Sequence, residues 1–274
     1  MNNNLIYKPK NAAAEYAPWA CNPYNGCGHD CAYCYLKRGI LKKQLGGSTP
    51  VIKKCFEGKT LQQCLQQFIN ALEHKKKQLV NDGGIFFSFT TDPCLPETID
   101  LCSALMSEAV LRGVPVTLLT KRADWIDNGT MRFLIGNSLF CAGFTLTGRD
   151  DLEPNASTNE ERIEAMQQLH TSGTKTFASI EPVIDCESSL RMIQKTIGYC
   201  DLYRIGLMSG VGKDYYDKGE IARFFAKVTE LQLKNNLNIY WKESVRKFAE
   251  GNSNLQELLK IHSVPVNYNI FNEQ

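Results

Sequence analysis

The segment from Cys21 to Tyr35 holds the pattern in this chain that most directly predicts chemistry. Cys27, Cys31 and Cys34 follow one another at C-x3-C-x2-C spacing, in a stretch rich in Gly, Asn and Pro. A loop of this composition can wrap three thiolates around one face of an iron–sulfur cluster, whereas a helix or strand spreads its side chains along an axis. Three protein ligands leave one iron of a [4Fe–4S] cluster open to a substrate or cofactor, so the spacing predicts an open-site cluster.

Two other metal sites compete with this interpretation. A structural zinc site usually takes four ligands from two separated pairs, and the sequence holds no second Cys-x-x-Cys motif and no His pair. His29 is available as a fourth ligand, but it lies inside the first cysteine spacing. A ferredoxin-type cluster takes a fourth cysteine, and the nearby Cys21 is expected on the preceding strand. Both alternatives fit the spacing less well than a three-cysteine site does.

Small and polar residues at the ends of several apolar runs form a second set of candidates. They are Thr91 and Asp92 after residues 85–89, Lys121 after 114–119, Thr145 and Thr147 near the end of 142–146, Ser179 and Glu181 near the end of 176–180, and Gly206 within 202–207. Functional groups gather at the carboxyl ends of parallel strands. Each candidate also has an ordinary structural interpretation: a turn with a helix cap for Asp92, a surface lysine for Lys121, and a charge before a helix for Glu181.

The apolar runs themselves predict the elements that position these residues. Near-continuous apolar character over 85–89, 114–119, 142–146, 176–180, 202–207 and 237–241 is typical of strands buried on both faces. Apolar residues at helical spacing predict helices over 61–72, 99–110, 190–197 and 221–231. Another helix, around Ile163, is expected to begin at a capping box formed by Ser157 and Glu160.

This alternation of strands and helices predicts a parallel sheet. With a strand near residues 19–22, the chain offers about six or seven strand–helix units, fewer than the eight of a closed barrel. Two architectures remain open on this pattern, a partial barrel and a doubly wound sheet.

Length, charge and cysteine content indicate which partners and which cellular compartment to expect. The chain has 274 residues and a formal net charge of +2, a balance that neither favours nor excludes a polyanionic partner. Its N-terminus has no signal-peptide pattern, and no apolar run reaches the ~18 residues of a membrane span. We therefore expect a cytoplasmic protein whose 11 cysteines are reduced. Short basic runs, such as Lys42-Lys43, are typical of solvated faces.

The cysteine motif, with Tyr33 before its third cysteine, resembles the signature of the radical S-adenosylmethionine (SAM) superfamily. Segments 22–27, 31–35, 87–93, 119–121 and 179–182 resemble, in order, blocks of its spore photoproduct lyase-like branch. The resemblance covers roughly residues 17 to 210. It implies an α/β fold, a partial (β/α)6-type TIM barrel, with a [4Fe–4S] cluster on Cys27, Cys31 and Cys34 and with SAM as the second cofactor.

The resemblance also gives the strand-end residues roles toward SAM. It implies that Tyr33 packs near the adenine, that Thr91 or Asp92 accepts a hydrogen bond from the amino group, and that Lys121 pairs with the carboxylate. The remaining assignments are Thr145 and Thr147 to the ribose hydroxyls, Ser179 and Glu181 to the methionine or ribose part, and Gly206 to the adenine.

We predict three parts: an N-terminal extension over 1–16, the core over 17–212, and a C-terminal helix–strand–helix extension over 213–274. The predicted activity is reductive cleavage of SAM to a 5′-deoxyadenosyl radical. A reducing partner such as flavodoxin or ferredoxin is expected. The substrate is unknown, with a nucleic acid or nucleotide slightly favoured, and a protein partner is possible. Phe89 stands where photoproduct lyase places a hydrogen-donating cysteine, which argues against that specific repair reaction. The alternative is a non-enzymatic metal-binding or partner-dependent protein with a structural cysteine cluster.

Overall fold

An eight-stranded sheet organises the chain in this computed structural model, which describes residues 5–38, 41–211, 215–260 and 263–272. Its spatial order is β1-β2-β5-β6-β7-β8-β9-β10. The strands are β1 (Ile6–Tyr7), β2 (Ala20–Cys21), β5 (Ile85–Phe87), β6 (Val116–Thr120), β7 (Phe140–Thr145), β8 (Lys175–Val183), β9 (Leu202–Leu207) and β10 (Ile239–Trp241). Within this sheet, strand β1 pairs antiparallel with β2, and all the other neighbouring strands are parallel. A second, two-stranded sheet joins β3 (Tyr24–Asn25) to β4 (Val51–Ile52).

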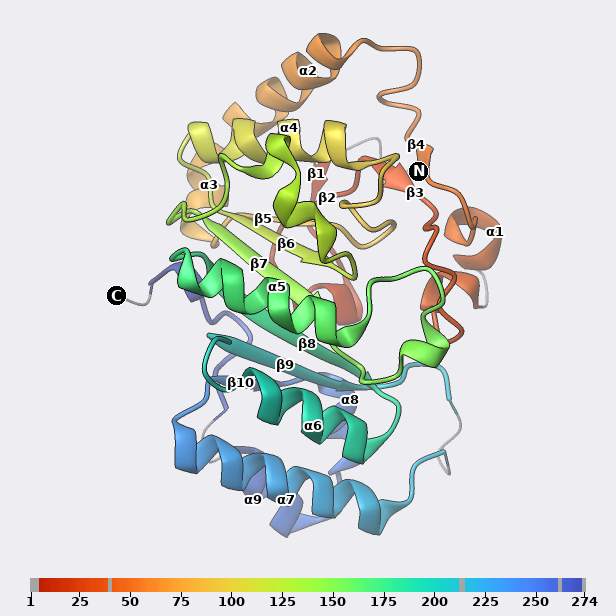
Figure 1. Ribbon diagram of the computed structural model, residues 1–274, viewed down its shortest axis with the longest axis vertical. Helices are drawn as coiled ribbons and strands as arrows, with labels where there is room; N and C mark the ends of the chain where they lie inside the picture. Colours follow the sequence, from red (N-terminus) through yellow and green to blue (C-terminus); the bar gives the residue numbers. More distant parts are fainter. Residues whose placement is uncertain (1–4, 39–40, 212–214, 261–262, 273–274) are drawn as a thin grey trace.

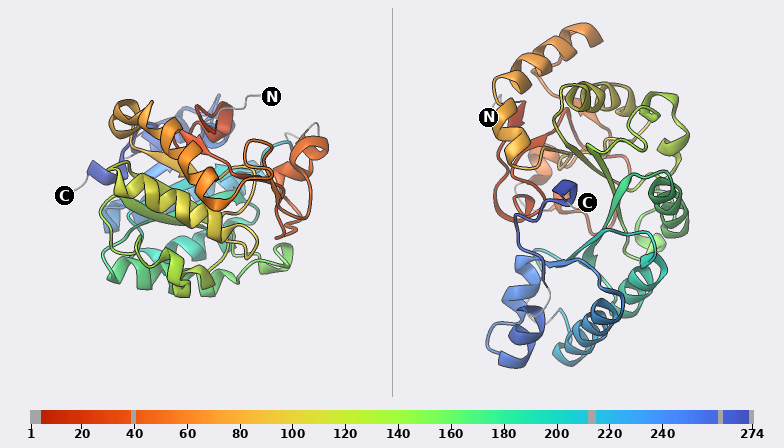
Figure 2. Two further views of the ribbon diagram at one scale, coloured as in Figure 1. Left: turned by 90° about the horizontal axis from the view of Figure 1, so that it is seen from above. Right: turned by 90° about the vertical axis from the view of Figure 1, so that its left-hand side faces the viewer.

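Helices cover the outer, convex side of the curved sheet (Figures 1 and 2). They are α1 (Leu41–Leu45), α2 (Leu61–Glu73), α3 (Lys76–Asn81), α4 (Ile99–Leu111), α5 (Asn159–Thr171), α6 (Cys186–Thr196), α7 (Lys218–Asn235), α8 (Glu243–Phe248) and α9 (Ser253–Lys260). Helix α1 is the exception, because it lies beside the loop that carries the cysteines (Figure 1). No helix in the described ranges is both long and apolar enough to cross a membrane.

Side chains alternate between the two faces of the sheet, which explains the near-continuous apolar runs. Ile85 and Phe87 join the cluster under the outer helices, whereas Phe86 between them joins an inner cluster with Phe177 and Tyr240. Residues two apart on a strand share a face. The inner face of β8 after Phe177 therefore carries Ser179 and Glu181.

The concave side of the sheet is closed at one end by the C-terminal segment. Ile270 belongs to the inner apolar cluster, and Val264, Tyr268 and Phe271 pack against it. Figure 2 shows this segment, with the 3-10 helix η6 (Ile270–Asn272), inside the arc of the sheet. The other end of the arc, at the carboxyl ends of the strands, stays open for ligands.

The predicted partial barrel is confirmed, since the parallel sheet curves without closing and matches the radical SAM partial barrel structures described below. The predicted capping box is wrong by one residue. Helix α5 is capped by Thr158, whose hydroxyl accepts from the Glu161 amide, while Ser157 instead bonds the Ala123 amide. Strand β5 also ends at Phe87, two residues earlier than expected. The boundary predicted between residues 212 and 213 lies outside the described residues.

Candidate functional site

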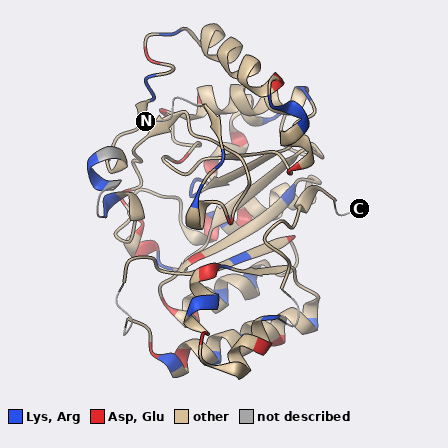
Figure 3. Cartoon of the chain, turned by 180° about the vertical axis from the view of Figure 1, so that it is seen from behind, with Lys and Arg blue, Asp and Glu red and all other residues tan. Residues whose placement is uncertain are grey.

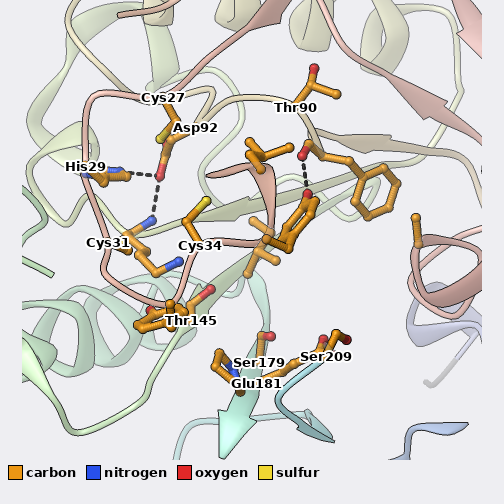
Figure 4. A pocket seen from close by; sticks show the side chains of 18 of the residues that line it. Cys27, His29, Cys31, Cys34, Thr90, Asp92, Thr145, Ser179, Glu181 and Ser209 are labelled. Carbon is orange, nitrogen blue, oxygen red and sulfur yellow. Dashed lines mark hydrogen bonds and ion pairs between the residues drawn. The ribbon is translucent and has the colours of Figure 1, made fainter. Parts of the chain in front are cut away.

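A cavity of about 520 Å³ opens at the carboxyl ends of the strands. Figure 4 shows Cys27, Cys31 and Cys34 on one side of it, with Ser179 and Glu181 across from them. Its lining includes these predicted residues: Cys27, Cys31, Tyr33, Cys34, Thr91, Asp92, Lys121, Thr145, Ser179 and Glu181. The fold therefore brings together most of the residues singled out by the sequence.

The cysteine loop is held in place by the residues that follow α1. The Cys27 amide donates to the Gly47 carbonyl at 3.0 Å, and β3 before it pairs with β4. Gly26 has a φ of +85°, and a Cβ added there would lie 2.5 Å from the Thr49 carbonyl oxygen. Only glycine tolerates both conditions, so this residue lets the loop lie flat against residues 46–52.

The cysteine thiols lie in a partly buried setting. Burial raises the pKa of Cys27 to about 12, although backbone N–H groups of His29 and Asp92 point at its sulfur and oppose the shift. Burial also raises the pKa of Cys31, against the opposing charge of Lys121. A thiolate at these positions needs a bound cation for stabilisation, which is the condition of a metal ligand rather than of a free nucleophile.

The donor set fits a cluster better than a single ion. Among the described residues, no three His, Cys, Asp or Glu side chains converge closely enough to hold one metal ion. A cubane cluster places its irons at separate corners, so its thiolate ligands stand farther apart than those of one zinc ion. Three cysteines lining one side of a single cavity meet that condition, and they are the soft ligands that iron–sulfur clusters take.

Asp92 fastens the cysteine loop to the sheet. One carboxylate oxygen, Oδ2, lies 2.7 Å from His29 Nε2 and accepts from the Lys121 amide at 2.7 Å. The other, Oδ1, accepts from Thr120 Oγ1 at 2.7 Å and from the Cys94 amide at 2.9 Å. Burial alone would raise the pKa of Asp92, but His29 and these donors hold it at about 2. Both oxygens therefore already have protein partners.

Tyr33 anchors the third cysteine to a buried ion pair. Its hydroxyl donates to Glu153, and Arg162 Nη2 lies 2.5 Å from Glu153 Oε2, with both side chains fully buried. Arg162 also donates to the carbonyls of Ser157 and Thr145. The phenol ring is thereby fixed at the wall of the cavity.

The Lys121 ammonium is the group in this wall with unused hydrogen bonds. Its Nζ lies 5.5 Å from the centre of the Tyr33 ring. Across the described ranges no acceptor lies within hydrogen-bond distance of it. Burial by itself would lower the pKa of Lys121, but the charges of Cys31 and Glu153 raise it. A fixed, charged ammonium with free donors is suited to a ligand carboxylate.

A second polar cluster lines the opposite wall. Glu181 Oε2 accepts from Tyr16 Oη and from Lys242 Nζ, both at 2.6 Å, and Tyr16 Oη lies 2.6 Å from Ser179 Oγ. Lys242 is only 2% exposed. The cluster joins the N-terminal segment, β8 and the end of β10, and so links the two open edges of the barrel.

Two predicted residues lie outside the cavity lining. Thr147 is fully buried, and its hydroxyl accepts from the Arg149 amide at 3.2 Å. Gly206 lies beneath Glu181, where an added Cβ would come within 2.8 Å of Oε1. Gly206 therefore makes room for a cavity residue without facing the cavity itself.

Sequence reasoning assigned no role to Tyr16, Lys242, Glu153 or Arg162. Lys242 stands two residues after Tyr240, which lies on the inner face of the sheet. The alternation of side chains along β10 could therefore have predicted that Lys242 faces the cavity. No strand pattern in the sequence identifies Glu153 and Arg162, because their pairing depends on how the segment after β7 folds back.

Comparisons with known proteins place this fold. No family model matches the chain. An uncharacterized protein of Methanocaldococcus jannaschii, MJ0683, is 26% identical over 179 residues, which are 61% of each chain. The chain therefore spans about three fifths of the length of this curated relative.

The structural neighbours are radical SAM enzymes of low sequence identity. A variant of spore photoproduct lyase superposes with a TM-score of 0.61 at 11% identity, over 88% of this chain and 79% of that one. SuiB of Streptococcus suis, bound to SAM, gives a TM-score of 0.56 at 15% identity, over 81% of this chain and 46% of SuiB. Spore photoproduct lyase complexed with dinucleoside spore photoproduct gives a TM-score of 0.54 at 13% identity, over 83% and 64%. The chain thus has the α/β partial-barrel fold of these enzymes.

Proposed function

We propose that this chain, which has the fold of radical SAM enzymes, is itself such an enzyme, with a [4Fe–4S] cluster on Cys27, Cys31 and Cys34. The observation that supports this most is the meeting of the three cysteines and the unpaired Lys121 ammonium in one cavity at the strand ends. Reduced clusters of this kind supply one electron to SAM, which divides into methionine and a 5′-deoxyadenosyl radical.

Each wall of the cavity has a separate task in this proposal. Lys121 binds the carboxylate of SAM, while Tyr33, fixed by Glu153, packs against the adenine side. Asp92 positions this wall, because its oxygens accept hydrogen bonds from His29 and from the Lys121 backbone.

A nucleotide or nucleic-acid base is the substrate class we propose. The cavity lining also carries aromatic rings, Tyr16, Tyr35 and Phe89, and Phe89 stacks on Phe86 with ring centres 4.4 Å apart. Planar bases stack well on such rings. Loss of the stimulation of turnover by a cell extract after nuclease treatment would indicate a nucleic acid, and loss only after further phosphatase treatment would indicate a nucleotide. A response that neither treatment diminishes would refute this substrate class.

The test of the activity is product formation under anaerobic conditions. Reconstituted protein with dithionite and SAM should form 5′-deoxyadenosine and methionine, measured by mass spectrometry. Alanine at Cys27, Cys31 or Cys34 should abolish the product, whereas Cys186→Ala, a half-buried cysteine outside this cavity, should not. Colourless, zinc-loaded protein that forms no product would instead establish the structural metal site.

A further inference from the structure

The hydrogen bonds around Glu181 all run in one direction. Tyr16 Oη and Lys242 Nζ both donate to Glu181 Oε2, each at 2.6 Å. Burial and the charge of Glu181 raise the pKa of Tyr16 well above its ordinary value, so the phenol keeps the proton that it donates. Because that proton points to Glu181, the Ser179 hydroxyl must supply the hydrogen in its own 2.6 Å contact with Tyr16 Oη. The hydroxyl hydrogens of this group are therefore already used.

The Lys242 ammonium is enclosed by protein acceptors. Besides Glu181, it reaches the Ala12 carbonyl oxygen at 3.3 Å, and Glu15 Oε2 lies 3.8 Å away. It also lies 4.2 Å from the centre of the Tyr16 ring. An ammonium has three N–H groups to donate, and Lys242 is only 2% exposed. This lysine therefore serves the protein rather than a ligand.

The second oxygen of Glu181 is the opposite case. Across the described ranges, no donor lies within hydrogen-bond distance of Oε1, and this atom is not fully buried. Glu181 lines the cavity (Figure 4), and its side chain is 18% exposed. An ionised carboxylate only accepts hydrogen bonds. This end of the cavity thus offers an acceptor to a ligand, whereas Lys121 on the cysteine side offers donors.

An aromatic platform adjoins this acceptor. The Phe89 ring stacks on the buried Phe86 ring, with centres 4.4 Å apart and planes at 15°. Phe89 is half-buried and lines the cavity, so the part of its ring that Phe86 leaves uncovered meets the open space. The Tyr16 ring lies 6.1 Å from it in an edge-on arrangement. Since Tyr16 contacts both Phe89 and Glu181, the platform and the acceptor belong to the same end of the cavity.

Among the described lining residues, no unpaired cation stands at this end to meet a phosphate. The lysines of the lining are Lys37, Lys121 and Lys242. Lys37 is paired with Asp30, and Lys121 lies by Tyr33 on the cysteine side. Figure 3 shows basic and acidic residues intermingled on the side of the molecule that it draws. A planar, uncharged group therefore suits this end of the cavity better than a phosphate does.

We propose that Glu181 Oε1 accepts a hydrogen bond from the amino group of an uncharged planar base that lies against Phe89. This rests on the proposed function, for which it names the part of the substrate that the site recognises. Carboxylates accept from the exocyclic amine of cytosine in protein–nucleic acid recognition, and bases stack well on aromatic rings. Recognition is thus directed at the base, and any phosphate stays outside this end of the cavity.

Glu181→Gln should invert this recognition. Because Tyr16 and Lys242 both donate to one oxygen, the amide oxygen of the variant takes that position and its NH2 group takes the position of Oε1. Cytidine carries an amine where uridine carries a carbonyl oxygen. In equilibrium dialysis with saturating SAM, the iron-loaded parent should bind cytidine about tenfold more tightly than uridine, and the variant should prefer uridine. Glu160→Gln, at an exposed pair with Lys195, should keep the preference of the parent.

A change in the ligand tests the same hydrogen bond without altering the protein. N4,N4-dimethylcytidine has no amine hydrogen, so the parent should bind it about tenfold more weakly than cytidine. This comparison decides the matter even if Glu181→Gln does not fold.

Three results would overturn the proposal. The first is a parent that does not bind cytidine, or that binds uridine or dimethylcytidine equally well. The second is a folded Glu181→Gln variant that still prefers cytidine. The third is a variant with weaker SAM binding and an unchanged preference, since SAM would then be the ligand of Glu181, as the resemblance implies. Failure to form 5′-deoxyadenosine would instead refute the proposed activity, and nucleoside binding would still decide whether Glu181 recognises an amine.

Discussion

His29 Nε2 lies 2.7 Å from Asp92 Oδ2, and this buried contact ties the cysteine loop to the loop that follows β5. The histidine stands between Cys27 and Cys31, and its other ring nitrogen lies 3.0 Å from the Asn155 carbonyl oxygen. The cysteines are thus positioned by the sheet on one side and by the segment after β7 on the other.

Replacing Asp92 with asparagine should destabilise the protein before any cofactor is bound. The side-chain amide of the variant would turn its NH2 group toward donors that now share two carboxylate oxygens. Leaving buried donors unsatisfied should cost about 3 kcal/mol of unfolding free energy. Urea unfolding of the metal-free protein measures it.

The control for this variant is Asp30→Asn. Asp30 is exposed in its pair with Lys37 and has a φ of +56°, a conformation that asparagine tolerates. Its unfolding midpoint should stay close to that of the parent. Equal stability of the Asp92 and Asp30 variants would contradict a structural role for the Asp92 network.

Lys121→Met should weaken SAM binding without unfolding the protein. The substitution keeps the length of the side chain and removes the ammonium that lies free in the cavity. Losing a charge-assisted hydrogen bond should raise the dissociation constant for SAM about 10- to 100-fold. Equilibrium dialysis with the iron-loaded protein measures it.

Arg122→Met is the matched control, because Arg122 adjoins Lys121 in sequence but forms its ion pair with Asp124 at the surface. It should bind SAM like the parent. Unchanged affinity in the Lys121 variant would remove Lys121 from the binding site.

Arg162→Met should be among the most destabilising single changes in this region. Arg162 is fully buried, and its guanidinium serves Glu153 and the carbonyls of Ser157 and Thr145. Removing it leaves the Glu153 carboxylate buried without its cation, which should cost about 3–5 kcal/mol. Arg149→Met, which removes an exposed pair with Asp151, should leave the denaturation midpoint unchanged; a similar loss in both variants would refute this.

Gly206→Ala should disturb the far wall of the cavity through Glu181. The new methyl group would lie 2.8 Å from Glu181 Oε1, so the carboxylate must leave Tyr16 or Lys242. Overpacking of this kind should cost about 1–3 kcal/mol in thermal or chemical unfolding. Gly198→Ala, where an added Cβ has no heavy atom within 4 Å, should be neutral; matching losses in the two variants would contradict the close contact.

The sequence predicted the sheet well because its signal is local. Strands buried on both faces need continuous apolar runs, and the period of two then places Lys121, Ser179 and Glu181 toward the interior. The sequence also indicated that the three cysteines would lie together, since they come from one short loop, and they line one cavity; their role as cluster ligands stays a prediction.

The hydrogen-bond partners of these residues could not be predicted from the sequence. Asp92 was predicted to bind SAM, yet its oxygens contact donors from two other segments, the cysteine loop and the end of β6. Glu181 was predicted to face SAM, and it pairs with Tyr16 and Lys242, respectively 165 and 61 residues away. Such pairings depend on the tertiary arrangement of distant segments, which local sequence patterns do not specify. The SAM contacts of both residues stay predictions.

The open iron site is the centre of this account, and electron paramagnetic resonance of the reduced, reconstituted protein tests it most directly. We predict the signal of a [4Fe–4S] cluster whose g-values change when SAM is added, and whose signal is lost with alanine at Cys27, Cys31 or Cys34. A cluster signal that SAM leaves unchanged, or reconstituted protein without iron, would contradict it.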